Sequence, residues 1–209
     1  PMILWALDAL AAVEPGNVVV VLGPEGDEVT PSLPAGMRTG LQEVRDGTGG
    51  ATLIGLAALP DDVDTVVVMC GDTPLVDPAL VDALISDHVH SGRSATMVTA
   101  ILDDGGAYGR VVRGPDGVRV VEADATVVAG INTRVHLAEC EAAIQERLRE
   151  QVMLGGVTMP DPSRVVLEAG VTVGQDTVLW PGTILRGATT IGEGCDIGPD
   201  VLMVDATVG

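Results

Sequence analysis

Large aliphatic residues recur at every sixth position near the end of the chain, and this period constrains the fold more than any other feature. The series is Leu167, Val173, Leu179, Leu185, Ile191, Ile197 and Met203. Two positions before each lies a small or β-branched residue, in the series Val165, Val171, Thr177, Thr183, Thr189, Cys195 and Val201. An ordinary antiparallel sheet alternates by two without a fixed period of six. The pattern therefore predicts a parallel β-helix of hexapeptide repeats, with tight corners at Gly174, Gly192 and Gly198.

Before the repeats, up to about residue 154, helix-like and strand-like segments alternate. Helical apolar spacing covers 2–13, 49–60 and 77–93, whereas β-branched runs cover 17–23, 65–70 and 94–102. Asp77 and Pro78 provide an N-cap and a proline at the first helical position. Strand, helix and strand in succession predict an α/β fold with a parallel sheet.

Two further segments complete this organisation. Residues 109–122 hold two short β runs around Gly114-Pro115-Asp116-Gly117, which is a hairpin signal. Residues 134–154 predict a long connecting helix without Gly or Pro, whose acidic and Arg face we expect to be solvated. We therefore expect three parts, namely an α/β domain over 1–133, a connecting helix over 134–156 and the start of the β-helix over 157–209.

The charge of the chain argues against polyanionic partners. It has 30 acidic and 11 basic residues, a net charge of −19 and no Lys. Such a surface repels phosphodiesters, so we expect neither nucleic acid nor an anionic membrane as a partner. The three cysteines, Cys70, Cys140 and Cys195, share no metal-ligand spacing and predict buried thiols in a reducing compartment.

No targeting or membrane segment is evident in the sequence. No stretch reaches the roughly 18 apolar residues that a membrane span needs. The apolar first residues, 1–13, include Asp8 and have no basic leader. We therefore expect a cytoplasmic protein.

The segment "VVVMCGDTPLVDP", residues 66–78, indicates a ligand site. Its predicted strand ends at Gly71-Asp72, and the carboxyl edge of a parallel sheet is where such sheets bind ligands. One carboxylate holds Mg²⁺ weakly and leaves other positions to phosphate and water. Asp72 could also be an ordinary turn former. A metal–nucleotide site would need a base pocket and a second oxygen ligand.

A family resemblance rests on motifs in a fixed order. They are "LQEVRDGTGGA", "VVVMCGDTPLV", "YGRVV", "VVEADAT", "VAGINTRVHLAE" and "GVTMPDPSRV", the last leading into the hexapeptide repeats. Together they resemble the bifunctional bacterial N-acetylglucosamine-1-phosphate uridyltransferase/glucosamine-1-phosphate acetyltransferase family over essentially the whole chain. The resemblance implies a Rossmann-like nucleotidyltransferase domain followed by a left-handed β-helix, and a homotrimer.

The resemblance also implies roles for single residues. Gln42, Gly47 and Thr48 match the segment that reads uracil, although a plain Gly-rich loop before a helix would look alike. Cys70 and Gly71 match the backbone next to the ribose.

The metal and sugar residues follow from the same motifs. Asp72 and Asn132 match the two protein ligands of Mg²⁺. Gly109 matches the wall of the amino-sugar pocket, and Glu122 a carboxylate that binds sugar hydroxyls, unless it is only an exposed hairpin acid. His88, His90 and His136 have no ligand spacing, and we expect no catalytic role for them.

The implied reaction is transfer of a uridylyl group from UTP to N-acetylglucosamine-1-phosphate. It yields UDP-N-acetylglucosamine, a cell-wall precursor, and pyrophosphate. Positioning and charge neutralisation by Mg²⁺ do the work, and no protein nucleophile is needed. In the full-length family members a second activity transfers an acetyl group from acetyl-CoA to glucosamine-1-phosphate.

Several family features are missing from this sequence. The Gly-rich loop and the Lys that hold the triphosphate are absent, so no catalytic residue can be named. Thr126 is followed directly by Val127 where the family has a further stretch, and Gly50 replaces a usual His. We expect the chain to be part of a longer polypeptide, inactive by itself, rather than a decayed homologue.

Two other functions fit the same motifs. One is a related sugar-1-phosphate nucleotidyltransferase with another base or sugar, although Gln42 and the motif order favour uridine. The other is a catalytically inactive trimeric regulatory or scaffold protein, which the missing Lys favours and the retained Asp72, Glu122 and Asn132 oppose.

Overall fold

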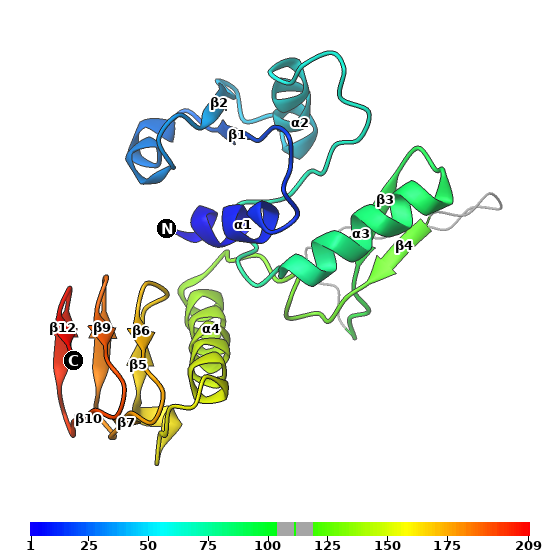
Figure 1. Cartoon of the computed structure of the whole chain (residues 1–209). Coiled ribbons are helices and arrows are strands. Elements are labelled where there is room, and N and C mark those ends of the chain that lie inside the picture. The colour runs from blue at the N-terminus through cyan, green and yellow to red at the C-terminus, as the bar shows by residue number, and fades with distance from the viewer. Residues whose placement is uncertain (104–110, 112–118) are drawn as a thin grey trace. The chain divides into compact units, whose positions relative to one another are not determined.

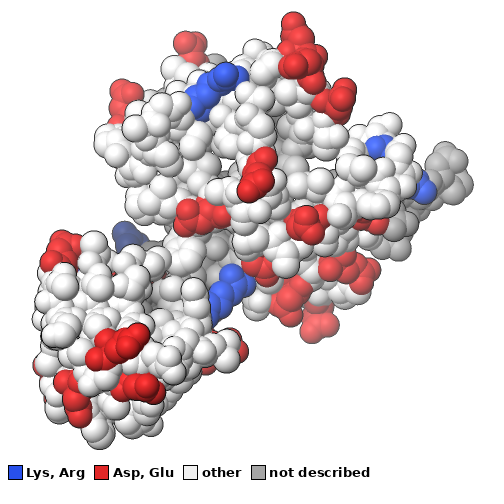
Figure 2. Space-filling view, viewed as in Figure 1, with Lys and Arg blue, Asp and Glu red and all other residues white. Residues whose placement is uncertain are grey.

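The structure, a computed structural model, describes residues 1–103, 111 and 119–209. It divides into two compact units, residues 1–131 and 132–209, and each is described by itself (Figure 1). Of the described helices, none combines the length and hydropathy needed to cross a membrane. Acidic side chains greatly outnumber Arg on the face drawn in Figure 2, as the composition predicts.

The first unit contains helices and short parallel strand pairs. Strand β1 pairs with β2, and β3 pairs with β4, both in parallel. The elements are α1 (Met2–Ala11), β1 (Val19–Leu22), β2 (Arg38–Leu41), α2 (Thr48–Ala57), α3 (Pro78–Ser91), β3 (Thr96–Thr99) and β4 (Arg119–Glu122), with short 3₁₀ turns at Gly26–Glu28 and Thr30–Ser32.

Local sequence signals set the ends of α3. The Asp77 side chain accepts a hydrogen bond from the Leu80 N–H over 2.8 Å, and Pro78 occupies the first turn. Gly92 ends the helix in the left-handed region with φ of 60°. The helices predicted over 2–13, 49–60 and 77–93 and the strands predicted over 17–23 and 94–102 are confirmed.

The strand predicted over 65–70 is wrong. These residues form no regular strand, and Val66 and Val68 are exposed. A β-branched run becomes a strand only when a neighbour completes its ladder, and no strand of the described residues pairs with it. Instead β2 pairs with β1, and the sheet predicted as one body consists of separate two-stranded pairs in the described part. The hairpin predicted around 114–117 lies outside the described residues.

Strand β2 was missed because "RTGL" lacks the β-branched composition of a strand. Its glycine has a packing reason. A Cβ added at Gly40 would lie 2.8 Å from Ile54 Cγ2, so only glycine lets α2 approach this strand so closely.

The second unit stacks short strands on one another after a long helix. Helix α4 covers Arg134–Leu154, as predicted, and a 3₁₀ turn covers Pro162–Arg164. The strands are β5 (Val166–Leu167), β6 (Thr172–Val173), β7 (Val178–Leu179), β8 (Ile184–Arg186), β9 (Thr190–Ile191), β10 (Asp196–Ile197), β11 (Leu202–Val204) and β12 (Thr207–Val208).

These strands form three parallel stacks, ordered β5-β8-β11, β6-β9-β12 and β7-β10. Val166 pairs with Ile184 and Ile184 with Leu202, which is a step of 18 residues, or three hexapeptides. The last step is shorter by one residue, because Thr190 pairs with Thr207. Val208 therefore packs against the core although it breaks the period of six.

The residues of the six-residue period form the core of this unit. Leu167, Leu179, Leu185, Ile191 and Ile197 are buried, and Val173 and Met203 pack against them half-buried. The positions two residues before these large residues carry small or β-branched side chains because they also point into the interior of the coil. Thr177, Thr183 and Thr189 are fully buried, and their hydroxyls donate to the carbonyl oxygens of Gly192, Ile197 and Arg186, respectively.

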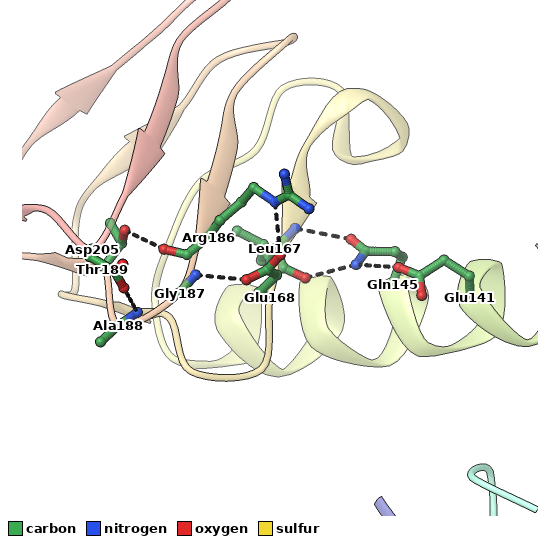
Figure 3. A network of polar contacts seen from close by, with 9 residues as sticks. All are labelled: Glu141, Gln145, Leu167, Glu168, Arg186, Gly187, Ala188, Thr189 and Asp205. Carbon is green, nitrogen blue, oxygen red and sulfur yellow. Dashed lines mark hydrogen bonds and ion pairs between the residues drawn. The ribbon is translucent and has the colours of Figure 1, made fainter. Parts of the chain in front are cut away.

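Helix α4 covers the open edge of β5 with polar side chains. Gln145 Nε2 donates to the Leu167 carbonyl oxygen over 2.7 Å, and its Oε1 accepts from the Leu167 N–H over 3.0 Å (Figure 3). Arg149 Nη1 donates to the Val165 carbonyl oxygen over 3.2 Å. Gln145 and Arg149 are four residues apart, a rise of about 6 Å along a helix, and Leu167 and Val165 are two residues apart, a rise of about 6.6 Å along a strand. The spacing of the two side chains therefore matches the spacing of the main-chain groups that they bind.

This contact corrects the expectation that the polar face of the helix is simply solvated. Gln145 and Arg149 are 8% and 9% exposed. A sheet edge left bare is a template for pairing with other chains. Here the Gln145 amide takes the place of the next strand.

We expect Gln145→Ala to lower the free energy of unfolding of this unit by about 2 kcal/mol, since it leaves a buried N–H and C=O without partners. Gln151→Ala is the matched control, because Gln151 is exposed on the same helix. Urea unfolding measures both variants. Equal stability of the two would show that the Gln145 contacts contribute nothing.

The network continues between neighbouring coils. Glu168 accepts hydrogen bonds from the Gly187 N–H over 2.7 Å and Arg186 Nε over 2.8 Å (Figure 3). These bonds, first that of Gly187 and then that of Arg186, hold the pKa of the Glu168 carboxyl below its usual value. Glu168 therefore remains an anion that ties its strand to the next coil.

Candidate functional site

The loop after β2 brings two of the predicted base-reading residues, Gln42 and Gly47, together. The Gln42 N–H donates to the Leu22 carbonyl oxygen over 2.8 Å, which continues the β1–β2 pairing. Its side-chain Nε2 donates to the Gly47 carbonyl oxygen over 2.9 Å and to Asp46 Oδ1 over 2.6 Å. Thr48 is exposed at the first position of α2.

Glycine makes this loop possible at the start of the helix. Gly47 is the N-cap of α2 with φ of 97°, a conformation that residues with a Cβ rarely adopt. The first N–H groups of a helix lack intrahelical partners and carry partial positive charge. The loop thus offers amide and main-chain groups of the kind that pair with the edge of a base.

The segment 70–73 forms a turn rather than the end of a strand. Thr73 Oγ1 donates to the Cys70 carbonyl oxygen over 2.9 Å, and the following Leu75 is buried. Gly71 lies against α1, where an added Cβ would come within 2.9 Å of Ile3 Cδ1. Asp72 is exposed at this turn. Its carboxylate is therefore accessible to a ligand.

Asp72 is connected to a segment distant in sequence. Its carbonyl oxygen accepts a hydrogen bond from the Ile131 N–H over 3.1 Å. Ile131 directly precedes Asn132, the second predicted metal ligand. The structure thus brings the residue before Asn132 to the main chain of Asp72.

Cys70 differs from the prediction of three buried thiols. Cys140 is buried and Cys195 half-buried, but Cys70 is exposed as a residue. Partial burial of its thiol, and then the charge of Asp72, raise the pKa of Cys70. A raised pKa disfavours the thiolate, which is the nucleophilic form of cysteine.

Asn132 opens the second unit just before α4. Its N–H donates to His136 Nδ1 over 3.4 Å, and Thr133 Oγ1 accepts from the His136 N–H over 3.1 Å as the helix cap. His136, for which we expected no catalytic role, thus supports the turn that holds Asn132.

The sugar residues are only partly described. Glu122 is exposed at the end of β4, and Gly109 lies outside the described residues. Near Glu122, Asp124 Oδ1 accepts from Thr126 Oγ1 over 2.6 Å and from the Thr126 N–H over 2.8 Å. These two bonds lower the pKa of Asp124. Sequence reasoning missed this turn, although an Asp two residues before a Thr is a turn signal.

Within the described residues, no three His, Cys, Asp or Glu side chains gather to bind a metal by themselves. In proteins Mg²⁺ is typically held by one or two carboxylates and takes its other oxygens from phosphate and water. An exposed carboxylate at Asp72 and an amide at Asn132 are donors of that kind.

The comparisons with known proteins agree with these motifs. The family described as "MobA-like NTP transferase domain" matches residues 1–150. Bifunctional protein GlmU of Heliobacterium modesticaldum is 32% identical over 100% of this chain and 60% of its own length. The proteins of that name from Mycolicibacterium vanbaalenii and Streptomyces avermitilis are 33% and 34% identical over 100% and 97% of the chain and 57% of their own length.

The chain spans about 60% of the length of the curated relatives it matches. The alignment with the Heliobacterium protein covers 274 positions, against 209 residues in this chain, so the relative has residues where this chain has none. These relatives confirm the resemblance drawn from the motifs. The chain belongs to the MobA-like NTP transferase family.

Proposed function

We propose that this chain is part of a uridylyltransferase that makes UDP-N-acetylglucosamine and pyrophosphate from UTP and N-acetylglucosamine-1-phosphate. The observation that carries the proposal is the Gln42–Gly47 loop, where the predicted base-reading residues share hydrogen bonds at the start of α2. Family membership and whole-chain similarity to the bifunctional relatives support it.

In this proposal the loop reads the uracil. Gln42 and the main chain at Gly47 pair with the imide edge of the base, and the lack of a side chain at Gly47 allows the base to approach. Thr48 adds a hydroxyl at the exposed end of α2. Cys70 and Gly71 border the ribose with their main chain.

Asp72 and Asn132 are the proposed Mg²⁺ ligands, through a carboxylate and an amide oxygen. When bound, Mg²⁺ neutralises charge on the phosphates. The support from this chain is the exposed Asp72 and the hydrogen bond from the Ile131 N–H to the Asp72 carbonyl oxygen, both within the first unit. Glu122 and Gly109 are the proposed sugar-binding residues.

The reaction needs positioning rather than a protein nucleophile. A phosphate oxygen of the sugar-1-phosphate attacks the α-phosphorus of UTP, the bond to the β-phosphate oxygen breaks, and pyrophosphate leaves. The chain orients the base, ribose and sugar around the reacting phosphates.

The second unit fits a further activity of the full-length protein. We propose that its 18-residue stacks are the first coils of a left-handed β-helix that forms a homotrimer and transfers acetyl groups from acetyl-CoA to glucosamine-1-phosphate. The division near residue 131 is close to the domain boundary proposed at 133. The proposed compartment is the cytoplasm, where cell-wall precursors are made.

Nucleotide binding by the full-length protein tests the proposal. With Mg²⁺ present, calorimetry should show binding of UTP that is at least about tenfold tighter than that of ATP, because adenine lacks the imide edge that the paired hydrogen bonds would read. Preference for another base would favour a related nucleotidyltransferase. If no nucleotide binds, an inactive scaffold protein is favoured. This is the second candidate function because the sequence has no Lys to hold the triphosphate.

A further inference from the structure

Asp46 lies within the proposed base-reading loop, although the sequence motifs assign it no role. Its Oδ1 accepts a hydrogen bond from Gln42 Nε2 over 2.6 Å. Its own N–H donates to the Val44 carbonyl oxygen over 2.8 Å, which folds the loop tightly. The carboxylate is therefore held against the side chain that is proposed to read the base.

These contacts determine which way the Gln42 amide faces. Nε2 meets two oxygens, Asp46 Oδ1 and the Gly47 carbonyl oxygen, at 2.6 and 2.9 Å. An amide oxygen in that place would face two acceptors, so the nitrogen must occupy it and both its N–H bonds are used. The amide oxygen Oε1 is then the atom that can accept a hydrogen bond from a ligand.

An acceptor at this position discriminates between pyrimidines. Uracil carries an N–H at N3, whereas cytosine has an unprotonated nitrogen there. Gln42 Oε1 can accept from the former and is repelled by the latter. A flipped amide would present N–H groups and reverse the preference, so fixing the amide is a source of specificity.

Gly50 provides the space for the Asp46 carboxylate. A Cβ added at Gly50 would lie 1.9 Å from Asp46 Oδ1, closer than any real contact, so a side chain there must displace the carboxylate. At Gly49, one position earlier in α2, an added Cβ meets nothing within 4 Å. Only one of two neighbouring glycines is thus needed for the Asp46 contact.

We propose that Asp46, with the space left by Gly50, is a positioning residue that holds the Gln42 amide with its oxygen toward the base and thereby selects uracil over cytosine. This inference rests on the proposed function. It identifies a determinant of base choice that lies outside the residues expected to touch the nucleotide.

A first experiment needs no nucleotide. In NMR spectra the two side-chain N–H signals of Gln42 should be well separated and slow to exchange with solvent. Asp46→Ala and Gly50→Ala should bring the signal of the N–H that donates to Asp46 to its solvent-exposed value, whereas Gly49→Ala should not. Gly49→Ala and Gly50→Ala change the helix propensity of α2 by the same amount. The two variants therefore differ only in the clash of the new Cβ with Asp46 at position 50. Unchanged Gln42 signals in Asp46→Ala and Gly50→Ala would overturn the inference.

Base selectivity is the second readout, measured by titrating UMP and CMP. The preference for UMP should fall about tenfold in Asp46→Ala and Gly50→Ala, the loss of one oriented hydrogen bond. Gly49→Ala should keep it, as should Asp46→Asn, whose side-chain oxygen can accept the same bond. If the wild-type protein prefers UMP and all variants keep the same preference, the inference about Asp46 is overturned but the proposed function is not. A wild-type protein that binds neither nucleotide would overturn the proposed function and this inference with it.

Discussion

Leu185→Ala should lower the free energy of unfolding of the second unit by about 3–5 kcal/mol. Leu185 is 0% exposed on β8, the middle strand of its stack, which pairs with β5 on one side and β11 on the other. The coils above and below hold it in place, so the cavity left by alanine cannot collapse easily. Large losses are expected where the surroundings relax least.

Leu202→Ala is the control for this prediction. Leu202 lies in β11 of the same stack but is 61% exposed, and exposed substitutions usually change stability by less than about 0.5 kcal/mol. Urea unfolding followed by Trp180 fluorescence, with Trp5 replaced by Phe, reports on this unit because the chain has only two Trp. Equal losses in both variants would contradict the view that the six-residue period forms the core.

Asp72→Asn should reduce uridylyl transfer by about 100-fold, comparable to removing one group that stabilises transition-state charge. The substitution keeps the size of the side chain and the main-chain bond to Ile131 but removes the negative charge. If Asp72 holds Mg²⁺, the Mg²⁺ concentration needed for half-maximal rate should also rise at least about tenfold.

Asp77→Asn is the matched control for the loss of a carboxylate. Asp77 lies five residues after Asp72 and caps α3 through Leu80, and asparagine caps helices about equally well. Its activity and Mg²⁺ requirement should match those of the wild type. If Asp72→Asn behaves the same way, Asp72 is only a turn residue.

The parts of the fold that sequence predicted are those set by local or strictly periodic signals. Helix α4 has the predicted bounds, because nothing in 134–154 interrupts it and Thr133 caps it. The series from Leu167 to Ile197, buried except for the half-buried Val173, follows from a period that repeats three times in every coil. The shorter last step, where Thr190 pairs with Thr207, breaks that period and could not be predicted from it.

What sequence could not predict depends on distant neighbours. The β-branched run 65–70 has strand propensity but no partner strand in the described part. In contrast, "RTGL" forms β2 because it pairs with β1 and packs closely against α2. Gln145 resembles any polar residue on a helix, and its burial follows only from where the edge of β5 lies.

The candidate site divides in the same way. Gln42 and Gly47 meet because they are close in the chain, so a motif can represent them. The bond between Asp72 and Ile131 joins distant segments, and the sequence indicated only that both stretches belong to one family pattern. Asp46 was overlooked because an acid in a Gly-rich loop is usually a turn former.

Product formation by the full-length protein shows whether it transfers uridylyl groups. UTP, N-acetylglucosamine-1-phosphate and Mg²⁺ are supplied, and UDP-N-acetylglucosamine and pyrophosphate are quantified. The proposed function predicts that both products form in equal amounts, that chelation of Mg²⁺ abolishes them, and that ATP does not replace UTP. Tight binding of UTP without either product, or equal turnover with ATP, would contradict it.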